Sequence, residues 1–191
     1  MRSCLRYLMA VLGFASFSAC TFNVQPDVPS ATAIPDSGSR LDCKATLLMP
    51  QEFANREYVS SFEGHEVRLM IGVPAAKAVE ALIRSKFTQV SEIPAAGDGT
   101  LELVRLASNQ NQTILIRPRF TRLESSVRPF RYNIEIGLAL DLEGLSEPLA
   151  PSGMGVGTAH LYDQSEIQKA SNAALAGAMD SLGSALPPRC H

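Results

Sequence analysis

The chain has 191 residues, enough for one ordinary domain with appendages, because domains usually comprise about 100 to 200 residues. With 46% hydrophobic and 19% charged residues it has enough apolar surface to form a packed core, which excludes wholesale disorder. The formal net charge of −2 excludes the strongly basic surface typical of nucleic-acid-binding proteins, so no nucleic-acid partner is expected.

The N-terminus has the pattern of a secretory signal. Arg2 and Arg6 come first, an apolar run from Tyr7 to Phe17 follows, and small residues end the segment. As a helix this run would be about 16 Å long, whereas the hydrocarbon core of a bilayer is about 30 Å thick. The run is therefore too short for an ordinary membrane span, and the sequence predicts a signal peptide over residues 1–19.

The last residues of this signal, Phe17-Ser18-Ala19-Cys20, resemble the lipobox of bacterial lipoproteins. Phe17 stands where that family usually has Leu, and it keeps the apolar character of the position. The resemblance implies lipidation of Cys20 by palmitate-type acyl chains, and Thr21 in place of Asp implies sorting to the outer membrane, with the protein facing the periplasm. The alternative is an ordinary secreted protein cleaved after Ala19, in which Cys20 is free or disulfide-bonded.

The segment after the lipobox is rich in proline and small polar residues. Residues 20–42 contain Pro26, Pro29 and Pro35 and little apolar periodicity, which predicts a flexible tether. A flexible coil of this length averages about 25 Å from end to end. The sequence thus predicts three parts: a signal peptide over 1–19, a lipidated cysteine with its tether over 20–42, and a periplasmic domain over 43–191.

The four cysteines have different expected fates. Cys4 leaves with the signal and Cys20 takes the lipid, so Cys43 and Cys190 remain, one at each end of the domain. In an oxidising periplasm a disulfide between them is the expected state. The alternative is two independent thiols at the two ends of the domain.

The first half of the domain is predicted to contain three strands and one helix. The strands show a short apolar run or period-two alternation, and they cover residues 45–49, 65–71 and 87–93. Residues 51–64 predict a loop closed by Gly64. Pro74 at a first helical position, followed by apolar residues spaced three and four apart, predicts an amphipathic helix over 74–86.

The second half is predicted to contain three further strands and a long helix. Residues 94–99 predict a turn, and residues 101–107 fit either a strand or a loose helical turn. The strands are expected at 113–120, 132–142 and 154–161. The first of them contains Pro118, which belongs at an edge or a bulge because proline cannot donate to a ladder. Gly144 is expected to turn the chain between the second and third strands.

The last helix is predicted from its cap and its apolar face. Asp163, with Glu166 three residues later, resembles a capping box, and Pro187 stops the helix. The many alanines on its apolar face permit close packing on a sheet. Together these elements predict an α+β fold, a two-layer sandwich in which two amphipathic helices pack on one mainly antiparallel sheet.

This order of elements resembles a group of periplasmic lipoprotein domains. The resemblance covers about residues 45–186 and rests on F-x-x-V at Phe87 to Val90, the alternating strand 132–142, the glycine-rich strand after it and the alanine-rich final helix. In these features the chain is similar to curli-secretion channel subunits, to the N-terminal domain of TolB-like proteins and to exopolysaccharide-export lipoproteins of the PelC type. The resemblance implies an accessory role in an envelope machine and carries no catalytic signature.

Cofactor, metal and catalytic patterns are weak. The glycines from Gly153 to Gly157 lack the spacing and the following helix of a dinucleotide-binding loop, so they predict a strand that another backbone can approach closely. A metal site is not expected, because the chain has no C-x-x-C motif and only three histidines, His65, His160 and His191. No G-x-S-x-G elbow marks a nucleophilic serine. We therefore expect no catalytic residues, no cofactor and no enzymatic activity.

Five arginines are the main departure from a balanced charge pattern. They are interrupted only by Glu124, and they are Arg117, Arg119, Arg122, Arg128 and Arg131. Guanidinium groups suit phosphates and other oxyanions, so this cluster is a candidate anion-binding site. The alternative is that the arginines only solvate an edge hairpin and oppose strand-to-strand aggregation.

The function expected from the sequence is that of a lipid-anchored periplasmic accessory protein of an export or surface-assembly machine. Its expected partners are the membrane, through the N-terminal lipid, and an envelope protein or further copies of the same chain. A second hypothesis is a binding module for an anionic envelope glycan or lipid, which would be held by the arginine cluster.

Overall fold

The computed structural model describes residues 21–29, 40–62, 65–96, 113–128, 131–145, 148–160 and 163–187. Its helices are α2 (Gln51–Ala54), α3 (Gly72–Lys86) and α5 (Gln164–Ala185). Its strands are β1 (Thr21–Val24), β2 (Leu41–Pro50), β3 (Glu57–Phe62), β4 (His65–Met70), β5 (Phe87–Ala96), β6 (Ile114–Arg128), β7 (Arg131–Glu143) and β8 (Ser152–His160).

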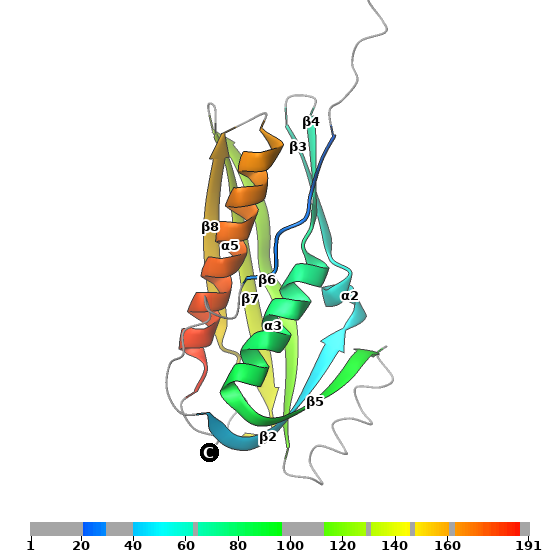
Figure 1. Cartoon of the computed structure of the whole chain (residues 1–191), viewed down its shortest axis with the longest axis vertical. Coiled ribbons are helices and arrows are strands. Elements are labelled where there is room, and N and C mark those ends of the chain that lie inside the picture. The colour runs from blue at the N-terminus through cyan, green and yellow to red at the C-terminus, as the bar shows by residue number, and fades with distance from the viewer. Residues whose placement is uncertain are drawn as a thin grey trace, which may run out of the picture.

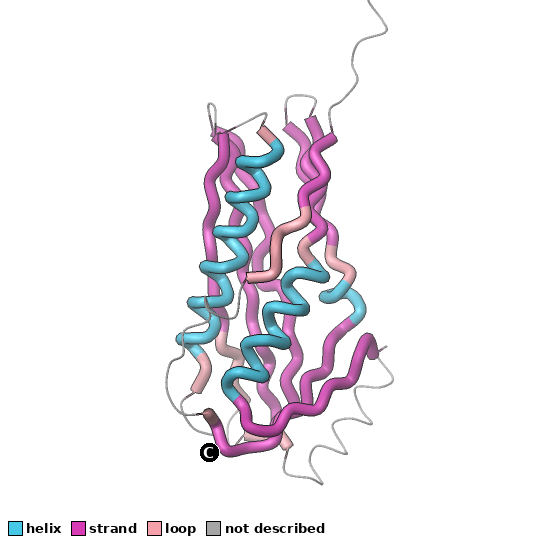
Figure 2. The backbone as a smooth tube through the Cα atoms, in the orientation of Figure 1, coloured by secondary structure: helices cyan, strands magenta, loops and turns pink. Residues whose placement is uncertain are grey.

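These strands form two sheets. The larger sheet has five strands in the order β5-β2-β6-β7-β8, and the smaller has three in the order β1-β4-β3. Figure 2 shows the strands in magenta and the helices in cyan. In the larger sheet β2 runs parallel to both β5 and β6, whereas β6, β7 and β8 form an antiparallel meander. Because β7 and β8 alternate buried and exposed residues along much of their length, one face of this meander is covered and the other is more open.

The two long helices and the smaller sheet form the second layer. Helix α5 contacts β7 and β8, and helix α3 contacts β2 and β5 (Figure 1). The smaller sheet lies beside α5 and faces the upper part of β6 and β7, where Tyr58 Oη lies 3.1 Å from Ser125 Oγ and Ser60 Oγ lies 2.9 Å from Tyr132 Oη. The molecule is therefore elongated along its strands, with one layer shared between helices and a short sheet.

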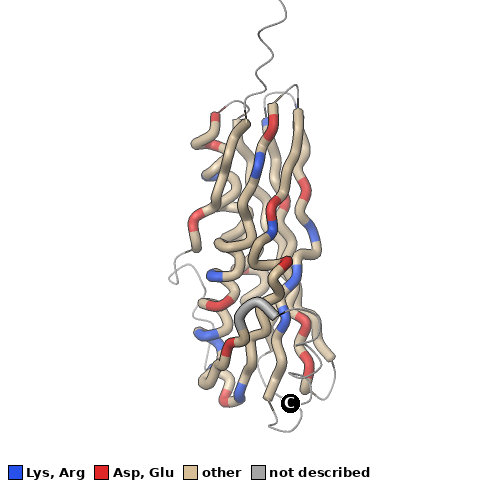
Figure 3. The backbone as a smooth tube through the Cα atoms, turned by 90° about the vertical axis from the view of Figure 1, so that its right-hand side faces the viewer, with Lys and Arg blue, Asp and Glu red and all other residues tan. Residues whose placement is uncertain are grey.

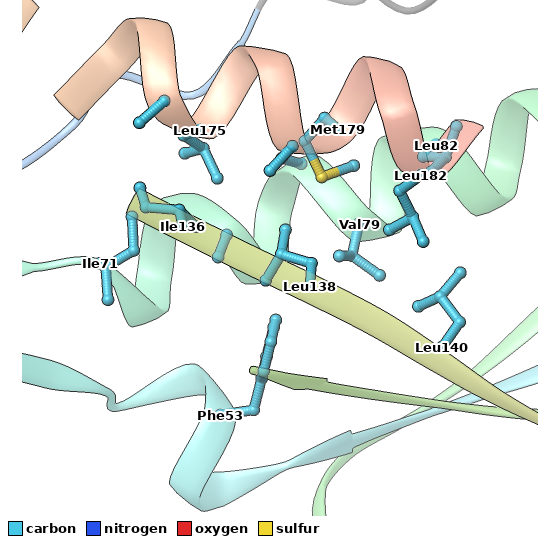
Figure 4. Packing of buried hydrophobic residues seen from close by; sticks show 14 of the residues in the cluster. Phe53, Ile71, Val79, Leu82, Ile136, Leu138, Leu140, Leu175, Met179 and Leu182 are labelled. Atoms are coloured by element: carbon cyan, nitrogen blue, oxygen red, sulfur yellow. The ribbon is translucent and has the colours of Figure 1, made fainter. Parts of the chain in front are cut away.

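The core lies between these layers. Alternate residues of β7, including Ile136, Leu138 and Leu140, are buried, and they lie close to α5 side chains such as Leu175 and Leu182 (Figure 4). Burying a side chain of this size contributes about 1.5 to 3 kcal/mol, so these apolar contacts help to hold the helices against the sheet. The expected class, a two-layer α+β fold, is confirmed.

Helix α5 approaches β8 unusually closely because both surfaces carry small residues. A Cβ on Gly153, Gly155 or Gly157 would overlap the backbone of α5. The opposing helix residues are buried alanines at four-residue spacing, namely Ala170, Ala174 and Ala178. The interpretation of the glycines as a strand that another backbone approaches closely is thus confirmed.

Several predicted elements need correction in detail. Residues 51–64 are not only a loop, because Phe53 is buried in α2 and β3 pairs antiparallel with β4. The sheet expected to be mainly antiparallel is mixed: among the described strands, β2 runs parallel to both β5 and β6, and in the smaller sheet β1 runs parallel to β4. The segment 101–107 lies outside the described residues.

The ends of the long helix follow the predicted chemistry only in part. The Asp163 carboxylate accepts hydrogen bonds from the backbone N–H groups of Ser165, at 2.8 Å, and Glu166, at 3.4 Å. The Ser165 hydroxyl, which donates to the same carboxylate at 2.8 Å, lowers the pKa of Asp163 most, and the two backbone bonds lower it further. The helix therefore has the expected N-cap, but the Glu166 side chain pairs with Lys169, at 2.8 Å, instead of completing a capping box.

The prediction of a flexible tether over residues 20–42 is wrong at both described ends. Thr21–Val24 form β1, which runs parallel to β4, and Leu41 and Asp42 already belong to β2. Val24 is fully buried, and the Asp27 backbone N–H donates to Asn172 of α5 at 2.9 Å. The sequence did not predict β1 because the strand is short, lies in a proline-rich segment and pairs with β4, more than forty residues later.

Candidate functional site

The arginines of the predicted cluster lie on β6 and β7, on the sheet face turned away from the helices. Their position follows from the ladder, in which Arg117 lies opposite Asp141 and Arg122 lies opposite Gly137. A bulge between Phe120 and Arg122 keeps the later arginines on the same face as the earlier ones. Basic and acidic positions interleave along the strands in Figure 3.

Three of the five arginines are paired with carboxylates on this face. Arg117 Nη2 lies 3.4 Å and Arg119 Nε 3.0 Å from the Asp141 carboxylate. Arg122 is 2.9 Å from both Glu124 and Glu135, and its pKa is raised, first by the hydrogen bond to Glu124 and then by the two negative charges. This part of the predicted anion-binding cluster is therefore a surface of internal ion pairs.

The other two arginines are placed differently. Arg128 and Arg131 lie directly opposite each other where β6 ends and β7 begins, and His160 at the end of β8 lies opposite Arg131. All three are exposed, and neither arginine has an ion pair with any residue in the described ranges. Like charges opposite each other in a sheet are unfavourable, so this end of the hairpin is electrostatically suited to an anion.

The description of the arginines as an edge hairpin holds only in part. Strand β6 pairs with β2 through Ile114–Ile116, and within the described residues this pairing ends at Ile116. The backbone N–H of Leu140 in β7 donates to the Pro151 carbonyl, on the side of β8. Pro118 lies opposite Leu140 in β6, so it belongs to a non-hydrogen-bonded pair and its nitrogen points away from β7. The expectation that Pro118 sits at an edge or bulge position is confirmed.

A small open pocket lies beside this unpaired side of β6. It has a volume of about 220 Å³ and is lined by Glu52, Phe53, Arg56, Pro118, Arg119 and Phe120. Its wall includes the stacked rings of Phe53 and Phe120, whose centroids are 4.6 Å apart. Arg119 already binds Asp141 and Glu52 supplies a negative charge, so the pocket is electrostatically mixed and gives no clear preference for an anion.

Strand β8 is one of the two edge strands of the larger sheet, the other being β5. Its burial alternates strictly: Gly153, Gly155, Gly157 and Ala159 face the helix layer, and the residues between them are exposed. Met154 and Val156 are 50% and 57% exposed on the other face, high values for large apolar side chains. Between Ser152 and His160 the strand contains no Lys, Arg, Asp, Glu or Pro, the residues that usually protect an edge from pairing.

The hydrogen bond between Leu140 and Pro151 shows which backbone groups of β8 point toward β7 and which point outward. Since Leu140 N–H donates to Pro151 C=O at 3.0 Å, the bonded pairs with β7 fall at Gly153, Gly155 and Gly157. The N–H and C=O groups of Met154 and Val156 therefore point outward from the sheet. The sequence predicted the strand but not its edge position, because strand order depends on pairing between distant segments.

A carboxylate pair was also missed. Glu80 on α3 and Glu92 on β5 share Arg84, whose Nε lies 3.0 Å from Glu80 and whose Nη2 lies 2.5 Å from Glu92. Burial first, and the nearby Glu80 second, raise the pKa of Glu92. The group borders a mostly apolar hollow of about 240 Å³ between α3 and β2–β5. This carboxylate pair could not be predicted from the sequence, because residues 80 and 92 come together only through the packing of α3 on β5.

Cys43 lies in β2, is partly buried against the core and is disulfide-bonded. Cys190 and Cys20 lie outside the described residues, so the pairing of Cys43 with Cys190 and the lipidation of Cys20 stay predictions.

The two histidines in the described residues lie in strands. His65 in β4 stacks on Phe22 with ring centroids 6.0 Å apart, and His160 is on the exposed side of β8.

We expect thiol reagents to leave Cys43 and Cys190 unlabelled in denatured, unreduced protein and to label both after reduction. A disulfide between Cys43 and Cys190 closes a loop of nearly the whole domain, and the chain-entropy model gives such a bridge up to about 5 kcal/mol of stabilisation. Reduction should therefore lower the melting temperature without abolishing the fold. Mass spectrometry of the linked peptides identifies the partner. Free thiols at both positions in freshly isolated protein would contradict the bridge.

No helix in the part of the chain that the structure describes is long and apolar enough to cross a bilayer. Comparison of the chain with protein-family models and with curated proteins finds no match.

Proposed function

We propose that this protein is a lipid-anchored accessory protein of an envelope export or surface-assembly machine, and that it binds a protein partner by adding a strand to β8. The observation that carries the proposal is the unprotected edge of β8. It combines outward-pointing backbone groups with exposed Met154 and Val156 and with a complete absence of charged residues between positions 152 and 159.

Strand addition fits this edge for a physical reason. Main-chain hydrogen bonds give affinity without requiring a particular partner sequence, and the exposed side chains at alternate positions supply specificity. The close packing of α5 on the glycines of β8 holds the strand in place before a partner arrives, which lowers the entropy cost of binding. Both an envelope protein and a second copy of this chain are compatible with such an edge.

The envelope location in this proposal comes from the sequence. The lipobox-like segment Phe17 to Cys20 supports a lipid anchor, and the disulfide at Cys43 supports an oxidising compartment. Binding of an anionic glycan along the whole arginine cluster is less well supported, because Arg117, Arg119 and Arg122 already hold carboxylates. Only the Arg128 and Arg131 end of the cluster keeps that capacity.

The substitution Val156→Pro tests the edge. Proline removes the outward N–H of residue 156 and leaves the β7 ladder intact, because the bonded positions are 155 and 157. We expect the variant to fold, with a melting temperature within a few degrees of wild type, and to lose its partner. The readout is native mass spectrometry of the detergent-extracted complex.

The control is Val156→Thr, which keeps the N–H and the β-branched shape and should retain the complex. A photo-crosslinker at position 154 should give adducts with the same partner, whereas one at Val59 of β3, which is 46% exposed against 50% for Met154, should not. A folded Val156→Pro variant that keeps the whole complex would rule out strand addition at β8.

A further inference from the structure

We propose that the end of the domain formed by the start of β1, the tip of the β6–β7 hairpin and the end of β8 lies on the membrane surface, where Arg128 and Arg131 bind lipid phosphate groups. This inference rests on the proposed lipid anchor at Cys20. It adds to that anchor a fixed orientation and a defined lipid-binding surface.

The first step is that nothing flexible separates the anchor from the fold. Thr21, the residue after Cys20, already pairs with Glu66 in the smaller sheet, and Val24 at the other end of β1 is fully buried. Consecutive Cα atoms are about 3.8 Å apart, so the acyl-bearing residue adjoins the end of β1. A lipid at Cys20 would hold this end of the domain against the bilayer.

The end of β1 and the segment after it are also fastened to the domain. Helix α5 holds them by three side chains: Gln164 donates to the Asn23 carbonyl at 2.9 Å, Gln168 donates to the Gln25 carbonyl, and the Asn172 amide donates to the Asp27 carboxylate at 2.6 Å. Motion of the anchor is therefore transmitted to the body of the domain. The domain cannot swing freely as it would on a long coil.

The second step is which residues share this end. Because β1 runs parallel to β4, its start lies beside the start of β4, and the β6–β7 hairpin reaches the same end of the molecule (Figure 1). Arg128 ends β6 and Arg131 begins β7, with His160 next to Arg131 on β8. Of the predicted cluster, the two arginines that form no ion pair with a described residue thus lie at the end where the anchor enters.

The third step is charge. Arg128 and Arg131 are exposed opposite each other, and two described acidic groups at this end already have partners: Glu66 pairs with Arg68 at 3.1 Å and Asp163 caps α5. Guanidinium groups bind phosphate oxygens through two parallel hydrogen bonds. A bilayer surface supplies phosphates at high density, and the anchor would bring it into contact with these two side chains.

The test uses full-length lipidated protein in vesicles of phosphatidylethanolamine and phosphatidylglycerol, some of whose headgroups carry a spin-label quencher. A fluorophore is attached at Val127→Cys, beside Arg128, or at Leu149→Cys, which pairs with Leu142 near the other end of β7. Both native side chains are 40% exposed, and they are separated by roughly 34 Å along the sheet. We expect quenching at position 127 to exceed that at position 149 several-fold.

The double substitution Arg128→Gln with Arg131→Gln should reduce this difference at least two-fold, and high salt should do the same to the wild type. The matched control is Arg40→Gln with Lys44→Gln, two exposed cations at the start of β2, at the opposite end, which should change nothing. Vesicle flotation is measured on every sample. Equal quenching at the two positions, or no effect of the arginine substitutions, in protein that floats would overturn the orientation and leave the anchor intact. Wild-type protein that does not float would contradict the anchor itself.

Discussion

Replacement of Gly155 by alanine is expected to destabilise the protein by at least about 3 kcal/mol, at the upper end of the usual cost of overpacking a core. An alanine Cβ would overlap the carbonyl oxygen of Ala174 and the backbone nitrogen of Ala178, both in the middle of α5. Backbone atoms of a 22-residue helix cannot rotate aside as a side-chain tip can, so the helix must move away from β8. That movement loosens the buried contacts of Leu175 and Leu182.

The matched control is Gly183→Ala, the same chemical change within α5. Its Cβ would meet only the Leu82 Cδ1 methyl, at 3.2 Å, and alanine is favoured over glycine in a helix by about 1 kcal/mol. We expect Gly183→Ala to melt within a few degrees of wild type and Gly155→Ala to melt about 10 °C lower or to fail to fold, measured by circular dichroism. Equal melting temperatures would show that α5 does not depend on close contact with β8.

The elements that the sequence predicted well are those whose signal is local. The alternation of Ile134, Ile136 and Leu138 and the cap at Asp163 arise from neighbouring residues, and both appear in the structure. The glycines of β8 were interpreted correctly as a site of close backbone approach because glycine at every second position leaves one face of a strand without side chains.

The elements that were missed depend on distant partners. Strand β1 has only four residues and is stabilised by β4 and α5, and β3 exists because it pairs with β4 across residues that looked like a polar loop. Sequence composition gives no information on such pairing. The predicted tether failed for this reason: proline and small polar residues indicate a flexible chain only where no sheet edge is available to capture it.

The arginine cluster shows the same limit at the level of a site. Counting arginines along the chain suggested one anion-binding surface, but Asp141 and Glu135, which neutralise three of them, lie on the next strand. Only the ladder register separates these three from Arg128 and Arg131. Charge clusters in β-hairpins therefore need the register before a binding role can be assigned to them.

Replacement of Cys20 by serine is expected to move the protein from the membrane fraction to the soluble periplasmic fraction and to remove all incorporation of labelled palmitate. Each buried acyl methylene contributes about 0.8 kcal/mol of membrane affinity, far more in total than two arginines on phosphate groups can supply. Cys4→Ser is the matched control, since it makes the same change within the signal and should leave both fractionation and labelling unchanged.

The structure adds a second readout to this experiment. Because β1 begins at Thr21 and is held by β4 and α5, loss of the acyl group should leave the fold and its melting temperature unchanged. The released variant should therefore keep its β8 edge and, in detergent extracts, its partner, while losing the preferential quenching near Arg128 on vesicles. Cys20→Ser protein that still sediments with membranes and incorporates palmitate would show that the lipid is attached elsewhere, and wild-type protein that is soluble and unlabelled would favour simple secretion after cleavage at Ala19.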